Sequence, residues 1–138
     1  MSTLLELITA HEQDIVNRWC REVRRLPDSI YSSVSDQVLM AAIRRSHQAL
    51  LNVMRTGETA PMAESLRAGA RQRAAQGVRY EDAVVGWLLY RQVLLEVLAD
   101  ALDTPDRWDE FVDRVDGLLQ WVMRVLRETY AEGSDDES

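Results

Sequence analysis

Apolar residues recur three and four positions apart along nearly the whole chain, and no other feature of the sequence restricts the fold as strongly. The pattern divides into five segments, at about 4–26, 35–56, 61–76, 80–102 and 104–131. Such spacing is typical of helices that bury one face, whereas no segment alternates apolar and polar residues as a half-buried strand does. We therefore predict an all-α single domain of about five helices, packed in a globin-like arrangement or as an antiparallel helical bundle.

The ends of these helices carry local signals. Thr3 can cap the first helix, because a glutamate follows three residues later as in a capping box, and Pro27 ends it. Ser33 or Ser35 can cap the second helix, and Gly57 is suited to its C-terminal stop. The fourth segment is apolar on nearly all sides, so we expect it to be the central helix.

Length and composition indicate one soluble domain. The chain has 138 residues, enough to hold a hydrophobic core without disulfides or metals. We expect residues 3–131 to form one helical domain and residues 132–138 to be a disordered acidic tail. There is no signal-peptide pattern, and the longest apolar run, residues 83–90, is too short to span a bilayer. Because Cys20 is the only cysteine, the chain fits a reducing compartment, and we predict a cytoplasmic protein.

The charge balance argues against two classes of partner. The net charge is −7, from 23 acidic and 16 basic residues, and every basic residue is an arginine. Nucleic-acid backbones reward clustered positive charge, and anionic membrane surfaces repel an acidic domain. We therefore expect neither a nucleic acid nor a membrane as a partner of this chain.

The sequence lacks the patterns on which common catalytic sites depend. Without lysine it can form neither a Gly-rich phosphate-binding loop nor a Schiff base, and it contains no GxSxG nucleophile elbow. Its histidines, His11 and His47, lie on the first two helices with Cys20, and neither follows a glutamate at the spacing of a di-iron bundle. We therefore predict that the domain is not an enzyme and holds no metal, no haem and no other cofactor.

A candidate ligand site combines residues of two helices. Trp87, Tyr90 and Arg91 stand together on the fourth helix, and His47 lies near the apolar stripe of the second. Aromatic walls with few polar groups are typical of small-molecule pockets, and an arginine in an apolar helix needs a negative partner. Arg91 can therefore recognise an acidic ligand, form an ion pair within the chain, or lie at an exposed edge. His47 can equally be a hydrogen-bonded core residue.

A candidate dimer interface lies on the fifth helix, which carries two adjoining apolar stripes. Phe111, Leu118 and Val125 form the second stripe, and Trp121 lies beside it. Tryptophan is a frequent anchor of protein interfaces, so this stripe can face a second copy of the chain. The alternative is that the helix is buried deeply within the monomer, because a wide apolar face is compatible with both arrangements.

Two stretches of the chain carry a family resemblance. The first is LLELI at 4–8 with IVNRW at 15–19, and the second is RQRAAQGV at 71–78 with ED at 81–82 and LLYR at 88–91. This pattern resembles the RsbRD-type N-terminal sensor domain, in which an arginine-rich helix ends in Gly-Val before a long apolar helix. Arg79 departs from the family, which usually has a small polar cap at that position.

The resemblance implies a bacterial signalling input module, related to the RsbR proteins of the stress-response complex called the stressosome. It implies a helical, globin-like, dimeric domain without haem that precedes an anti-sigma-factor-antagonist or kinase domain; we expect this chain to be a stand-alone module or a fragment. Our leading hypothesis is a sensory or regulatory domain that acts by homodimerisation and by binding a signalling partner or a ligand. The alternative is a small-molecule carrier or sensor with an apolar pocket near Trp87 and Tyr90.

Overall fold

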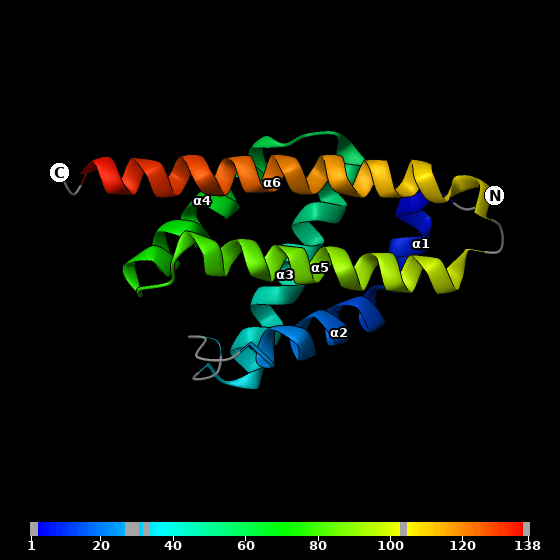
Figure 1. Ribbon diagram of the computed structural model, residues 1–138, viewed down its shortest axis with the longest axis horizontal. Helices are drawn as coiled ribbons and strands as arrows, with labels where there is room; N and C mark the ends of the chain where they lie inside the picture. Colours follow the sequence, from blue (N-terminus) through cyan, green and yellow to red (C-terminus); the bar gives the residue numbers. More distant parts are fainter. Residues whose placement is uncertain (1–2, 27–30, 32–33, 103–104, 137–138) are drawn as a thin grey trace.

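The structure, a computed structural model, describes residues 3–26, 31, 34–102 and 105–136. Within these residues the chain is all-α, as predicted, and contains no β-strand. The helices are α1 (Leu4–Ala10), α2 (Glu12–Arg24), α3 (Asp36–Thr56), α4 (Ala60–Ala75), α5 (Tyr80–Ala101), the 3-10 turn η2 (Pro105–Arg107) and α6 (Trp108–Asp136) (Figure 1). None of the helices in the described ranges combines the length and the apolar character that a membrane span needs.

The two longest helices, α5 and α6, run antiparallel, and the other helices pack around them (Figure 1). α6 contacts α4 as well as α5, and α5 also contacts α2. α3 crosses behind the pair at a steep angle, so the helices do not all follow one axis as in an up-and-down bundle (Figure 1). Tyr90, Leu94 and Leu98 of α5 are almost fully buried, which agrees with its predicted central position.

Two helix boundaries differ from the prediction. The first predicted helix is divided at His11, where φ is −110° and ψ is 18°, so that α1 and α2 run in different directions (Figure 1). No proline or glycine marks this break, and a hydrogen bond from Ile15 N to His11 O continues across it. At the other end, α6 continues through Asp136, because one glycine costs only about 1 kcal/mol within a helix. The segment 132–138, predicted to be a disordered tail, is therefore helical as far as it is described.

Local capping explains where α3 begins and ends. Ser35 Oγ accepts a hydrogen bond from the backbone N–H of Val38 at 3.3 Å, so Ser35 is the cap of this helix. Gly57 ends the helix with a φ of 76°, a left-handed conformation that favours glycine because it has no Cβ. Both residues therefore act as predicted, whereas Ser33 and Pro27 lie outside the described residues.

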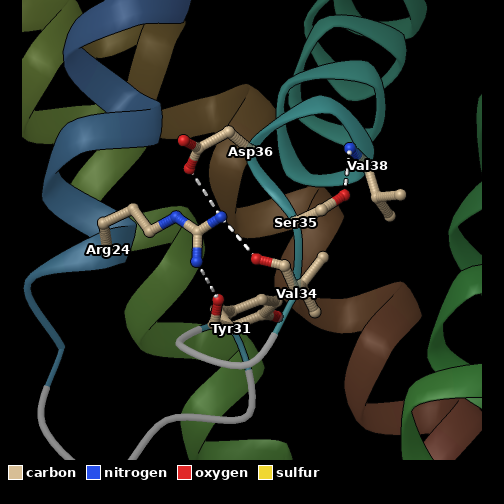
Figure 2. Close-up of polar contacts among 6 residues, drawn as sticks. All are labelled: Arg24, Tyr31, Val34, Ser35, Asp36 and Val38. Carbon is tan, nitrogen blue, oxygen red and sulfur yellow. Dashed lines mark hydrogen bonds and ion pairs between the residues drawn. The ribbon is translucent and has the colours of Figure 1, made fainter.

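Arg24 joins the end of α2 to the start of α3 (Figure 2). Its guanidinium donates from Nη1 to the carbonyl of Tyr31 at 2.8 Å and from Nη2 to the carbonyl of Val34 at 2.5 Å. Nη2 also lies 2.8 Å from Oδ1 of Asp36. One planar cation thus serves two loop carbonyls and one carboxylate, an arrangement that suits the fork of arginine better than the single ammonium of lysine.

Arg24→Lys is expected to lower the free energy of unfolding by about 1–2 kcal/mol, because lysine cannot span the three oxygens together. The control is Arg21→Lys on the exposed side of the same helix, which should change that free energy by less than about 0.5 kcal/mol. Urea unfolding followed by circular dichroism measures both variants. Equal effects of the two substitutions would contradict the joining role of Arg24.

Candidate functional site

Three of the four predicted ligand residues meet between α3 and α5. Nδ1 of His47 lies 2.7 Å from the hydroxyl of Tyr90, and the His47 side chain is fully buried. The ring of Trp87 packs edge-on against that of Tyr90, with the ring centroids 5.6 Å apart. Trp87 and Tyr90 share a face of α5 because they are three residues apart, and the crossing of α3 adds His47. Tyr90 therefore contacts both His47 and Trp87 in the core.

His47 is neutral in the folded protein. Burial lowers the pKa of its imidazole from 6.5 to about 4, because the charged form loses its hydration. Nε2 has no hydrogen-bond partner among the described residues but lies 3.9 Å from the carboxylate of Glu12. This approach favours the tautomer with the proton on Nε2, in which the hydroxyl of Tyr90 donates to Nδ1. Burial raises the pKa of Tyr90, which keeps that hydroxyl protonated.

Trp19 of α2 completes what we call the aromatic cluster, which comprises Trp19, Trp87 and Tyr90. The ring centroid of Trp19 lies 5.2 Å from that of Trp87 and 4.4 Å from that of Tyr90. Its indole Nε1 donates to the backbone carbonyl of Gly86 at 2.9 Å, which ties α2 to α5. The sequence did not single out Trp19, because a tryptophan on the apolar stripe of a helix resembles any other core residue.

Arg91, the fourth predicted ligand residue, pairs with Asp116 of α6 instead of joining the aromatic cluster. Its Nε lies 2.5 Å from Oδ1 of Asp116, and the two side chains are 37% and 35% exposed. The hydrogen bond to Asp116 raises the pKa of Arg91, and the same bond lowers the pKa of Asp116. The ion pair was one of three alternatives that the sequence left open. Because the pair is solvated, it contributes only about 0–1 kcal/mol to stability.

A cavity of about 320 Å³ adjoins the aromatic cluster. It lies among α2, α3, α4 and α5, and Trp19 and Trp87 form part of its wall. Tyr90 and His47 belong to the neighbouring core and do not line it. The volume falls at the lower end of the range that is typical of small-molecule sites in proteins. The arrangement therefore offers an aromatic wall to a small apolar molecule.

Comparison with protein-family models shows to which protein family the chain belongs. Residues 13–137 match the model of the RsbT co-antagonist protein RsbRD N-terminal domain. The chain belongs to this family. The resemblance noted in the sequence is thereby confirmed, and the match extends from the first turn of α2 through the end of α6. Searches of curated proteins and of solved structures gave no match.

The four predicted dimer residues of this RsbRD N-terminal domain differ in their exposure. Phe111 and Val125 are buried within the monomer, with 0% and 5% of their surface exposed. Leu118 and Trp121 are only partly buried and pack against the edge of the core. Because α4 and α5 both pack on α6, contacts within one chain already cover much of its wide apolar face. Of the four residues, Leu118 and Trp121 retain surface that a second copy can reach.

The other reactive side chains of the RsbRD N-terminal domain are dispersed. In the described part of the chain, no three His, Cys, Asp or Glu residues gather as metal ligands would. Cys20 is buried, and burial raises the pKa of its thiol, which disfavours the reactive thiolate. What the core provides is an aromatic wall beside a cavity, an arrangement typical of small-molecule sites.

Proposed function

We propose that this RsbRD N-terminal domain is a non-enzymatic signalling input domain, which acts as a homodimer and responds to a signalling partner or a ligand. The match of residues 13–137 to a domain of an RsbT co-antagonist supports the proposal most directly. In this proposal the domain works in the bacterial cytoplasm within a stressosome-type assembly. Signalling requires that the partner or ligand bind two arrangements of the helices with different affinities, because equal affinities shift no equilibrium.

The proposed dimer forms along α6 around Leu118 and Trp121. Both side chains lie at the edge of the core and keep part of their surface exposed. A tryptophan in this position is a frequent interface anchor, because its large ring buries apolar area with little loss of rotamer freedom. Phe111 and Val125 are buried, so they support the interface only by holding α6 in place.

A second candidate function is small-molecule sensing or carriage. The cavity of about 320 Å³ beside Trp87 favours it. The two functions are compatible, because a molecule in the cavity contacts α3 and α4 together and α4 packs directly on α6. Binding in the cavity can thereby alter the helix on which the proposed dimer forms.

Trp121→Ala is expected to raise the dissociation constant of the homodimer by about tenfold or more, because truncation of an anchor leaves its contact area unfilled. Trp108→Ala is the matched control, since it removes the same side chain from another partly buried position of α6. Sedimentation velocity over a concentration series measures both constants, and circular dichroism confirms the fold of each variant. An unchanged dissociation constant for Trp121→Ala would contradict the proposed interface.

A further inference from the structure

Small side chains on α3 and α4 leave the cavity unfilled. Ala42, Ser46 and Ala49 follow one another at helical spacing on α3, and Ser65 and Gly69 do so on α4, and all five line the cavity. The contact between α3 and α4 is sparse, whereas α4 packs closely on α6, so α4 is held at a distance from α3. The cavity is partly open to solvent, because Arg45, Ser65 and Gln72 in its wall are exposed. A small molecule can therefore enter it, and its volume of about 320 Å³ is large enough for one.

The wall of this cavity is positively charged, although the protein carries a net charge of −7. The lining residues include Arg45 and Arg73 but no aspartate or glutamate. Within the described residues, no carboxylate forms an ion pair with either of these arginines. A concave surface of one charge sign attracts ligands of the opposite sign. The charge of the wall therefore favours an anionic occupant.

Arg73 is the group that points to a specific contact. Its Nε atom is buried and has no hydrogen-bond partner in the described part of the chain. Nε has almost no accessible surface and is therefore out of reach from the cavity, but the Arg73 side chain lines the cavity, so its guanidinium can pair with an anionic oxygen placed there. Burial raises the pKa of Tyr31, the charge of Arg73 lowers that pKa, and the charge of Asp82 raises it. Arg73 and Asp82 therefore both act on the surroundings of Tyr31. The carboxylate of Asp82, however, lies 3.5 Å from Arg79 and does not line the cavity.

The remainder of the wall is largely apolar. Trp19 and Trp87 contribute aromatic rings, and Leu39 of α3 and Leu66 of α4 contribute aliphatic surface. Surfaces of this kind bind an apolar body by burying it, while a single charged group fixes its orientation. The occupant that matches both parts of the wall has an apolar body and one anionic head.

We propose that the cavity binds a small amphipathic carboxylic acid, with its apolar body against Trp19 and Trp87 and its carboxylate on the guanidinium of Arg73. Arg45, which is more exposed, adds a second positive charge to the wall. This inference rests on the proposed function, because the acid would be the ligand to which the signalling domain responds. It adds the chemical class of the ligand and the residue that recognises its charge.

Octanoate and its uncharged counterpart octan-1-ol test this proposal by isothermal titration calorimetry on the whole chain. Octanoate is expected to bind about tenfold or more tightly than octan-1-ol, because only the acid forms a charge-assisted pair. Arg73→Gln should abolish this preference and leave the affinity for octan-1-ol within about twofold of wild type, because the apolar wall is unchanged. Arg79→Gln, which removes an exposed arginine outside the cavity wall, should retain the preference.

Three results would overturn the inference: no binding of octanoate, equal binding of octanoate and octan-1-ol, or the same preference in wild type and Arg73→Gln. Ala42→Phe adds a test that does not depend on charge. The phenyl ring fills the cavity from α3 and should lower the affinity for both octanoate and octan-1-ol. Sedimentation velocity on the same samples distinguishes failure of the ligand proposal from failure of the proposed homodimer. A dimer that does not bind octanoate would overturn the ligand class alone. A protein that sediments as a monomer would contradict the proposed homodimer.

Discussion

Trp19→Ala is expected to lower the free energy of unfolding by about 3–5 kcal/mol, the range for buried aromatic residues truncated to alanine. Trp19 is 5% exposed and lies against both other rings of the aromatic cluster. Truncation removes these contacts, enlarges the adjacent cavity and deletes the donor to the carbonyl of Gly86. The space cannot close fully, because α2 and α5 are also held by the rest of the core.

Two variants serve as controls for this prediction. Trp19→Phe keeps an aromatic ring but lacks the indole N–H, and it should cost about 1–2 kcal/mol. Val38→Ala trims a side chain that is 60% exposed and should change the free energy of unfolding by less than about 0.5 kcal/mol. Urea unfolding with a two-state fit measures all three variants. A smaller cost for Trp19→Ala than for Trp19→Phe would contradict the structural role of the aromatic cluster.

Acidification is expected to remove roughly 3 kcal/mol of stability through His47 alone. The pKa of its imidazole is about 4 in the folded protein, against an ordinary value of 6.5. Between these two pH values the unfolded chain binds a proton that the buried imidazole does not, so the free energy of unfolding falls as the pH falls. The contribution of His47 is complete above pH 6.5 and is lost progressively as the pH approaches 4.

His47→Asn isolates this effect, because asparagine does not titrate and still presents a polar atom to the hydroxyl of Tyr90. The titration of carboxylates is common to both proteins and cancels in the difference between them. The stability of wild type relative to His47→Asn should therefore decline by roughly 2–3 kcal/mol between pH 7.5 and pH 4.5 in urea unfolding. A difference that stays constant over this range would show that His47 is not held neutral by burial.

The helices were largely predictable from the sequence, because a helix depends mostly on its own residues. Ser35 and Gly57 bound α3 by capping interactions that span four residues or fewer. The break at His11 has no comparable local signal, since its backbone hydrogen bonds continue and only the directions of α1 and α2 change. The periodicity of apolar residues therefore does not predict features that depend on how the helices pack on one another, such as this change of direction.

The candidate site was predictable only in part for the same reason. Helical spacing places Trp87 and Tyr90 on one face of α5, but the partner of Tyr90 comes from α3, 43 residues away in sequence. Arg91 follows Tyr90 directly, yet a helix turns about 100° per residue, so its side chain reaches Asp116 on α6. The role of Arg73 depends on the gap between α3 and α4, and no pattern within either helix reveals that gap.

The homodimer is central to the proposed function, and native mass spectrometry of the untagged protein tests it most directly. The same spectrum also shows any small molecule that the cavity retains. We predict a dominant species at twice the 15.8 kDa mass of the chain. A spectrum that contains only the monomer at micromolar concentration would contradict homodimerisation.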